Sequence, residues 1–273
     1  MSKKVIINAK GIEYAYTYDS EVPDNLHISH CHDHYEILFV VSGNGKYIVE
    51  GSSFNIRPST LIVIRPFEYH SVILEATAVY ERYCIKFSEH ALVDEARALL
   101  MRLMQDSSVS GKYFPAAVLP HAVYSLFERF DLALSLSENE RSVYVKMLLS
   151  ELIILLSAED GEAMHHEEEE LGARVIRYLN ENINRDVSLD KLAKRFFVSK
   201  YYLCRAFKKH NGITVHGYIN FKRVMIAKQL IEGGETASGA AYRVGFGDYS
   251  SFYRAYVKIV GTAPTAVLEG ENG

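Results

Sequence analysis

Residues 188–210 read SLDKLAKRFFVSKYYLCRAFKKH, and this stretch decides the fold of the carboxy-terminal part of the chain. Ser188 can cap a helix, and Asp190 in its first turn suits the positive end of the helix dipole. The spacing of the apolar residues predicts a short amphipathic helix that ends at a break, Phe197-Val198. Its apolar face consists of Leu189, Leu192, Ala193 and Phe196.

A second short helix is predicted directly after the break. Ser199 can cap it, and it runs over Lys200–His210 with Leu203, Ala206 and Phe207 on its inward face. Two short helices with a tight break between them form a helix-turn-helix unit, whose second helix reads the major groove of DNA. The outward face of this second helix carries Tyr201, Cys204, Arg205 and Lys208.

The same pattern recurs further along the chain. A long helix over 215–231 stops at Gly233-Gly234, a pair suited to end a helix. A second pair of short helices follows, with Thr236 as the cap of 237–244, Gly245-Phe246-Gly247 as the break and Asp248 as the cap of 249–260. We therefore expect two helix-turn-helix units, at about 188–210 and 236–260, joined by a linker helix.

Residues 171–268 resemble the AraC/XylS family of transcriptional regulators. The matching positions form an ordered series of about 100 residues: Leu192-Ala193, Ser199, Leu203, Phe207-Lys208, Gly212, Arg223, Ala227, Leu230, Ala241, Gly245-Phe246, Asp248, Phe252, Gly261 and Pro264. The resemblance implies that both recognition helices enter major-groove segments on one face of double-stranded DNA.

The resemblance also implies which residues contact DNA. Carried over by position, the residues that reach bases are Tyr201, Cys204 and Arg205 in the first unit and Tyr249, Ser250, Ser251, Tyr253 and Arg254 in the second. Arginine can bond guanine through two nitrogens, whereas lysine suits phosphate oxygens, which position a protein without reading sequence. The lysines expected at phosphates are Lys200, Lys208, Lys209 and Lys258.

Four departures from the family pattern concern the two units. Ala240 stands where a bulky aliphatic residue is usual, Tyr256-Val257 replaces Phe-Lys, and no basic residue follows Pro264. Phe197 occupies a turn position that glycine often holds. These departures leave the fold prediction unchanged, but the affinity of the second helix-turn-helix unit for DNA stays open.

Charge divides the chain into two parts. Residues 171–273 hold 16 lysines and arginines against 8 aspartates and glutamates, whereas residues 1–170 hold 14 against 26. A basic carboxy-terminal part joined to an acidic amino-terminal part indicates that the former alone meets a polyanion. Between them, residues 159–170 are polar and strongly charged, which predicts a solvated linker.

The amino-terminal part is predicted to be a small β-barrel followed by helices. Strands are expected at 36–41, 46–50, 61–65 and 79–87, with Ser42–Lys46 as the turn of a hairpin between the first two. A helix is expected at 92–105. Two further helices are expected as an antiparallel pair: one carries a stripe of apolar residues, and the other covers 143–156. The stripe consists of Val123, Leu126, Phe127, Phe130 and Leu134.

A histidine-rich segment in this barrel resembles the two cupin motifs. His30-Cys-His-Asp-His-Tyr-Glu36 is similar to the first motif, and Pro66-Phe-Glu-Tyr-His70 to the second. The resemblance implies that His30, His32, Glu36 and His70 line one site. Three imidazoles and a carboxylate suit a divalent transition metal, but a small-molecule pocket without metal and a structural remnant are the alternatives. His34 lies on the same stretch.

The expected organisation is a multidomain α+β protein: a cupin-like sensing and dimerisation domain at 1–158, an acidic linker at 159–170 and an all-α DNA-binding domain at 171–273. Neither a secretory signal nor a stretch of about 20 apolar residues is present, so we expect no membrane association. Cys31, Cys84 and Cys204 form no disulfide framework or zinc pair, which is typical of a reducing cytoplasm.

Three functions compete. The first is a homodimeric regulator that binds a small effector, with a sugar as one candidate class, and that meets RNA polymerase if it activates transcription. The second is a cupin-type metalloenzyme with a helical appendage. The third is a constitutive DNA-binding protein whose barrel serves only to dimerise. We expect the first and expect no catalysis.

Overall fold

The computed structural model describes residues 2–20, 30–75, 79–105, 111–159, 171–185 and 187–264, with side chains from Ile6 onward. The chain divides into two compact units, a first unit, Met1–Glu167, and a second unit, Glu168–Gly273. The linker predicted at 159–170 lies outside the described residues except for Glu159, so its boundaries stay a prediction.

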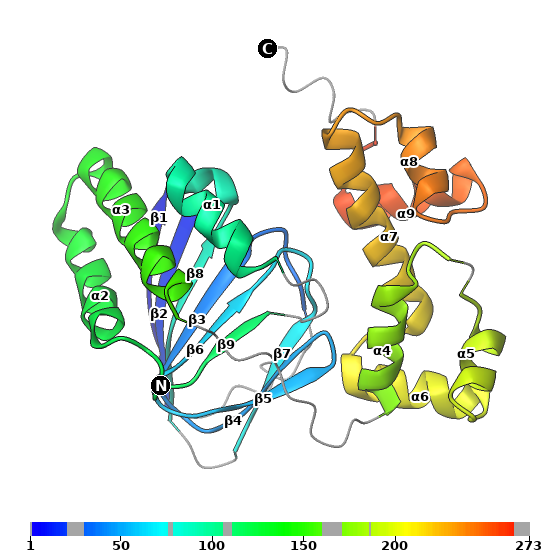
Figure 1. The fold of residues 1–273 in the computed structure, drawn as a ribbon, viewed down its shortest axis with the longest axis horizontal. Helices are drawn as coiled ribbons and strands as arrows, with labels where there is room; N and C mark the ends of the chain where they lie inside the picture. The colour runs from blue at the N-terminus through cyan, green and yellow to red at the C-terminus, as the bar shows by residue number, and fades with distance from the viewer. Residues whose placement is uncertain are drawn as a thin grey trace. The chain divides into compact units, whose positions relative to one another are not determined.

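The first unit is built from two antiparallel sheets (Figure 1). A six-stranded sheet has the order β1-β2-β8-β3-β6-β9, and a three-stranded sheet has the order β5-β4-β7. The strands are β1 (Ser2–Ala9), β2 (Ile12–Asp19), β3 (Tyr35–Ser42), β4 (Gly45–Val49), β5 (Ser52–Ile56), β6 (Thr60–Ile64), β7 (His70–Leu74), β8 (Tyr80–Phe87) and β9 (Lys112–Phe114).

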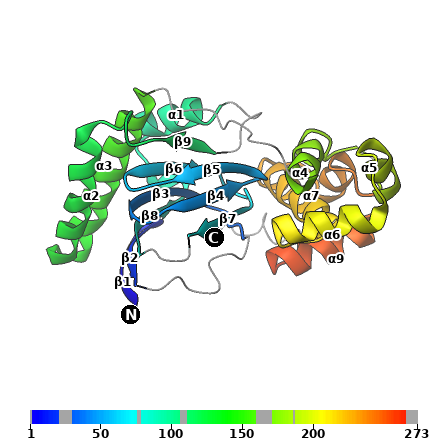
Figure 2. The same ribbon diagram turned by 90° about the horizontal axis from the view of Figure 1, so that it is seen from below.

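Helices cover the outer face of the six-stranded sheet (Figure 2). They are α1 (Asp94–Leu103), α2 (His121–Leu132) and α3 (Glu138–Ser157), with the short 3-10 turns η2 (Glu89–Ala91) and η3 (Ala133–Ser135). One apolar core joins these helices to the sheet, and a second core lies between the two sheets. The fold class expected from the sequence is confirmed, with the barrel built as two facing sheets.

Strand β3 shows why this part of the sequence lacks polar alternation. Ile37 and Phe39 belong to the core under the helices, whereas Leu38 and Val40 belong to the core between the sheets. Because successive side chains of a strand point to opposite faces, a strand buried on both faces has a continuous apolar sequence.

The predicted hairpin at Ser42–Lys46 is wrong. β3 pairs with β6 and β8, whereas β4 pairs with β5 and β7, so this turn carries the chain from one sheet to the other. A Cβ on Gly45 would lie 2.2 Å from the carbonyl oxygen of Ile73. Glycine is thus required here for the close approach of β4 to β7, not for a hairpin.

The helical pair α2–α3 is present, with one correction to the predicted stripe. Val123, Leu126, Phe127 and Phe130 are buried, but Leu134 lies in η3 and is exposed, with Ala133 buried in its place. α2 ends at Leu132, so the helical period does not extend to Leu134. α3 begins five residues before the predicted start, where Ser137 and Glu140 form a capping box.

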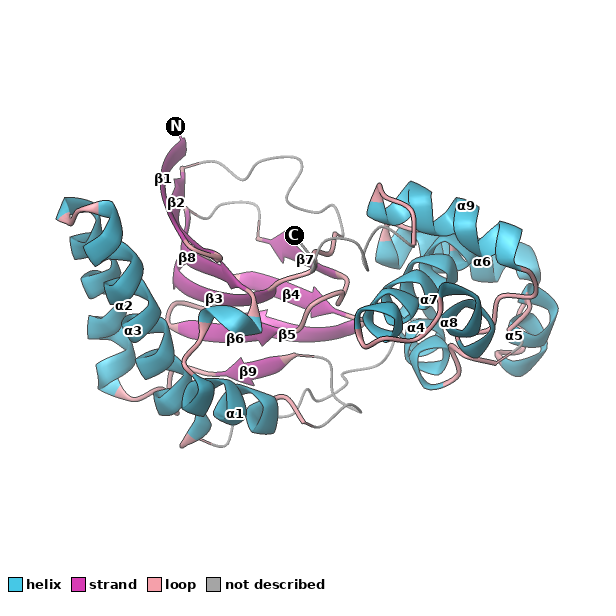
Figure 3. Cartoon of the chain, turned by 90° about the horizontal axis from the view of Figure 1, so that it is seen from above, coloured by secondary structure: helices cyan, strands magenta, loops and turns pink. Residues whose placement is uncertain are grey.

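In the second unit, Glu168–Gly273, every regular element of the described residues is a helix (Figure 3). Each N-cap expected from the sequence is present: Ser188, Ser199, Thr236 and Asp248 accept a backbone N–H from the first turn of their helices. The helices are α4 (Leu171–Glu181), α5 (Leu189–Arg195), α6 (Lys200–Asn211), α7 (Val215–Glu232), α8 (Ala237–Arg243) and α9 (Tyr249–Val260). No helix among the described residues of the chain is long and apolar enough to cross a membrane.

Arg223 of the linker helix α7 connects the segment that follows α4 to the turn of the second helix-turn-helix unit. Its guanidinium donates to the carbonyl oxygens of Ile183, Arg185 and Gly245 at 2.7–2.9 Å. The first two carbonyls follow α4, and the third lies in the turn between α8 and α9. Three charge-assisted bonds from one planar group fix α7 against the segment after α4 and against the turn between α8 and α9.

The turns of the two units differ at one position. Gly245 has φ +91°, a conformation that suits glycine, and a Cβ there would lie 3.0 Å from Arg223 and Asn184. In the first helix-turn-helix unit the corresponding residue is Phe197, with φ +55° and 94% of its surface exposed. A left-handed backbone costs a non-glycine residue roughly 1–2 kcal/mol. The ring of Phe197 is too exposed to offset this cost by burial.

We expect Phe197→Gly to raise the free energy of unfolding by about 1 kcal/mol, because relief of the backbone strain exceeds the added entropy of the unfolded chain. Phe197→Ala is the matched control, since alanine keeps the strain and removes only an exposed ring. Chemical denaturation of the full chain measures both. Equal stabilities of the two variants would contradict strain at this turn.

Candidate DNA-binding surface and sensor site

The outward face of α6 carries the residues expected at DNA. Tyr201, Arg205, Lys208 and Lys209 are exposed, and Cys204 is half-buried. The inward residues Leu203 and Phe207 are fully buried in the helical core. This division follows from the amphipathic pattern, because residues three and four apart share a helix face.

Lys200 differs from the other cations of α6. Its Nζ lies 2.8 Å from Oδ1 of Asp190 on α5, and the two form an exposed ion pair within the first helix-turn-helix unit. No carboxylate of the described residues forms a salt bridge with Arg205, Lys208 or Lys209. The last three are therefore available to bases and phosphates, whereas Lys200 must exchange Asp190 for a phosphate.

The outward face of α9 presents a shorter list of cations. Ser250, Tyr253, Arg254 and Lys258 are exposed, and Tyr249 and Ser251 are half-buried. Phe252 and Tyr256 fill the inward face. Arg254 donates to the hydroxyl of Ser251 at 3.4 Å, so its guanidinium lies along the outer face.

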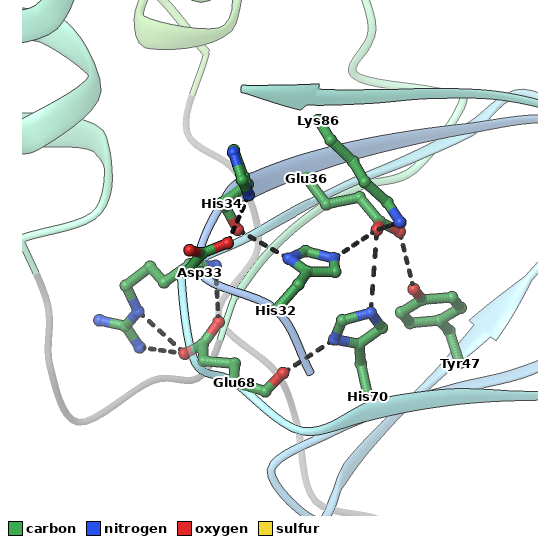
Figure 4. A network of polar contacts seen from close by, with 9 residues as sticks. His32, Asp33, His34, Glu36, Tyr47, Glu68, His70 and Lys86 are labelled. Atoms are coloured by element: carbon green, nitrogen blue, oxygen red, sulfur yellow. Dashed lines mark hydrogen bonds and ion pairs between the residues drawn. The ribbon is translucent and has the colours of Figure 1, made fainter. Parts of the chain in front are cut away.

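In the amino-terminal unit, Met1–Glu167, three of the four residues expected at one site converge (Figure 4). Glu36 comes from β3, His32 from the loop before it, and His70 from β7 of the opposite sheet. His32 Nε2 lies 2.8 Å and His70 Nε2 3.8 Å from the same oxygen, Glu36 Oε2. Tyr47 donates to the other carboxylate oxygen, Oε1, at 3.3 Å, and Lys86 Nζ lies 3.9 Å from Oε2.

Backbone carbonyls set the tautomers of both imidazoles. Nδ1 of His32 donates to the carbonyl of His34 at 3.0 Å, and Nδ1 of His70 donates to the carbonyl of Glu68 at 2.8 Å. Because a carbonyl oxygen can only accept, each neutral ring has its lone pair on Nε2, facing Glu36. The short His32–Glu36 contact thus requires a proton or another cation between the two atoms.

His70 has one nitrogen without a hydrogen bond to the part of the chain that the structure describes. Its ring is 1% exposed, and within the described residues its Nε2 has no hydrogen-bond partner. Burial lowers the pKa of His70 to about 4, so the ring is neutral near pH 7. Burial opposes ionisation of Glu36, but the His32 hydrogen bond and the neighbouring basic groups lower its pKa to about 2.

The donor set fits a divalent transition metal. The three ligand atoms lie within 4.8 Å of one another, and tetrahedral bonds of roughly 2.1 Å require about 3.4 Å between ligands. Metal-bound imidazoles usually donate their second nitrogen to a backbone carbonyl, as both do here. A cation at this point would also give the orphaned Nε2 of His70 a partner.

The two remaining histidines of the segment lie differently. His30 forms a backbone bridge with His70, and their ring centroids are 4.4 Å apart, but His30 is not one of the three converging ligands. His34 pairs with the exposed Asp33 and points away from the cluster (Figure 4). β3 begins only at Tyr35, so strand alternation does not place 30, 32, 34 and 36 on one face.

A cavity of about 460 Å³ lies beside the cluster and includes His30 and Glu36 in its wall. Most of its polar lining was not predicted from the sequence: Glu13, Thr17, Tyr47, Ser71, Tyr80, Arg82 and Lys86. The signal was present in β8, where Tyr80, Arg82, Cys84 and Lys86 alternate and so share one face. Without the pairing of β8 with β2 and β3, that face could not be assigned to a cavity.

Two family models match the chain. A model described as "AraC-like ligand binding domain" matches residues 14–163, and one described as "Helix-turn-helix domain" matches residues 192–270. The first alone covers more than half of the chain.

Curated relatives match over most of their length. The HTH-type transcriptional activator RhaS of Escherichia coli is 23% identical over 251 residues, covering 89% of this chain and 88% of that protein. The uncharacterized HTH-type transcriptional regulator YbfI of Bacillus subtilis is 26% identical over 229 residues, covering 81% and 80%. Among solved structures, ToxT of Vibrio cholerae is 15% identical, covers 95% of this chain and 98% of that chain, and has a TM-score of 0.36.

Proposed function

We propose, from the premise that the chain belongs to the AraC family of transcriptional regulators, that α6 and α9 read one DNA duplex and that the cavity beside β8 takes the effector. The observation that carries the DNA contacts is the pair of outward faces, where Arg205 and Arg254 are exposed while the inward faces are buried. The residues proposed at bases and phosphates are those predicted from the sequence.

The lining of the cavity favours a polar effector. Tyrosine hydroxyls, Thr17 and Ser71 can exchange hydrogen bonds with hydroxyl groups, and Glu13 and Lys86 offer an acceptor and a donor on paired strands. A sugar fits this chemistry, with aromatic rings available for stacking on its apolar face. RNA polymerase as a partner and a cytoplasmic location stay predictions.

Regulation requires that the effector bind one state of the protein more tightly than the other. A ligand that bound both states equally would leave DNA occupancy unchanged, however high its affinity. The proposed mechanism is therefore a shift between two presentations of the DNA-binding unit, driven by differential affinity at the cavity.

The test is binding of the full chain to a duplex site selected from random sequences, with and without candidate ligands. A change in the dissociation constant with a sugar, an aromatic acid or a metal would support sensing. An unchanged constant across all three classes would leave a constitutive DNA-binding protein as the better account.

We also propose that His32, Glu36 and His70 hold a divalent transition metal, supported by the two Nε2 lone pairs directed at one carboxylate oxygen. In a regulator this metal would shape the cavity or act as the effector itself. A cupin-type metalloenzyme would need the same ligands, but the curated relatives above are transcriptional regulators, so we favour regulation.

A homodimer is proposed through the outer face of α3. Val143, Met147 and Ile154 are exposed by 62%, 62% and 50%, and their spacing places them on one face of the helix. Exposed apolar side chains in such a row are typical of a protein interface. A second copy of the chain is the occupant that the family membership favours.

We expect Met147→Lys to convert the dimer to a monomer at micromolar concentration, because a charge placed in an apolar interface loses its hydration without a partner. Sedimentation equilibrium measures the change in mass. Met101→Lys on α1 is the control, since Met101 is exposed by 38% on a different helix. A dimer that persisted in Met147→Lys would place the interface elsewhere.

A further inference from the structure

A groove of about 440 Å³ lies between the linker helix α7 and the recognition helix α9. From α9 it is lined by Ser251, Arg254 and Lys258, which belong to the proposed DNA face. From α7 it is lined by His216 and Asn220, which neither the family pattern nor the predicted contacts include. The groove therefore continues the proposed DNA face onto the linker helix.

The groove presents hydrogen-bond donors and positive charge. Asn220 Nδ2 donates to His216 Nδ1 at 3.4 Å, which leaves the proton of a neutral His216 ring on Nε2 as a donor. Lys258 and Arg254 form no salt bridge within the described part of the chain. Arg223 also lines the groove, but its nitrogens are bound to three carbonyls.

Asp248 is the single carboxylate among the lining residues, and it is already engaged. Its Oδ1 accepts the backbone N–H of Ser251 at 2.8 Å as the N-cap of α9. The groove thus combines several donors with a single carboxylate, which already accepts a backbone hydrogen bond. An anion with several acceptor oxygens suits this arrangement better than a neutral or cationic ligand.

The first helix-turn-helix unit is packed more tightly at the corresponding place, between α4 and α6. There α4 packs directly on α6, and a Cβ on Gly172 would lie 2.4 Å from Cβ of His210. The first helix-turn-helix unit has two lysines shortly before the C-cap glycine of α6, Lys208 and Lys209. At the corresponding positions before Gly261, α9 has Val257 and Lys258.

We infer that His216 and Asn220 of the linker helix, together with Lys258, hold one backbone phosphate of the DNA bound by the second unit. The linker helix thus replaces the phosphate contact that Val257 cannot make. This inference rests on the proposed DNA binding. It makes α7 a part of the interface as well as a spacer.

The test uses the full chain and a fluorescent duplex of about 30 base pairs with mixed sequence, at low ionic strength, because phosphate contacts do not depend on sequence. His216→Ala and Asn220→Ala should each weaken binding about fivefold, the typical net effect of losing one hydrogen bond. His216→Gln, which keeps a donor, should recover part of the loss. Gln229→Ala, exposed near the far end of α7, is the control and should bind as the parent does.

A double variant, His216→Ala with Lys258→Ala, tests whether the two side chains contact the same phosphate or act independently. If His216 and Lys258 hold the same phosphate, the combined variant should lose less than the product of the two single losses. Parental affinity in both His216→Ala and Asn220→Ala, or fully multiplicative losses, would overturn the inference. The proposed function fails separately, if the parent chain itself does not bind the duplex.

Discussion

Arg205→Ala is expected to weaken binding to a selected DNA site by roughly 5- to 150-fold and to relax the preference at one base pair. The expected loss corresponds to about 1–3 kcal/mol, the value of one two-nitrogen contact to guanine. Arg205 is exposed on α6, whose inward side chains Leu203 and Phe207 are buried, so the variant should fold normally. Site selection from random duplexes, followed by anisotropy titration, measures both effects.

Lys208→Ala is the matched control on the same helix. It should weaken binding to all sequences about equally and flatten the dependence on salt by about one unit of slope. The same loss of specificity in both variants, or unchanged affinity in Arg205→Ala, would show that α6 docks differently from the proposal.

The second large effect, a loss of metal affinity, is expected at the cluster of His32, Glu36 and His70 in the amino-terminal unit. Glu36→Gln and His70→Ala should each reduce affinity for Zn²⁺ by at least about 100-fold, because even outer contacts of a metal site contribute 10- to 100-fold. Titration against a chromophoric chelator measures the affinity, and thermal melting with and without metal shows whether each variant is folded. Glu36→Gln keeps the size of the side chain and so protects against loss of packing.

His34→Ala is the control for this site, because His34 lies on the same segment but pairs with Asp33 away from the cluster. It should bind metal as the parent does. Less than a tenth of an equivalent of transition metal in the purified parent, with no binding on titration, would exclude the metal. The cavity would then stand as a purely organic ligand site.

The helical unit was predictable because its signals are local. Ser188, Ser199, Thr236 and Asp248 act as N-caps within their own helices, and apolar residues at helical spacing mark the buried faces. Even the unusual turn was visible, since Phe197 at a glycine position has the left-handed backbone that such a position implies.

The sensor unit was less predictable because its contacts are distant in sequence. Gly43 and Gly45 suggest a hairpin locally, but the turn connects two sheets, which only the partners of β3 and β4 reveal. The cluster likewise joins Glu36 of one sheet to His70 of the other. The cavity wall formed by β2 and β8 depends on strand pairing across about 70 residues, which spacing alone does not encode.

The salt dependence of DNA binding by the full chain tests the central claim most directly. With Lys200, Lys208, Lys209 and Lys258 at phosphates, a plot of log affinity against log salt concentration should fall with a slope of about −3.5. Binding should be readily measured at low ionic strength and should lose roughly one unit of slope for each lysine removed. Failure of the full chain to bind any double-stranded DNA at low ionic strength would contradict the account.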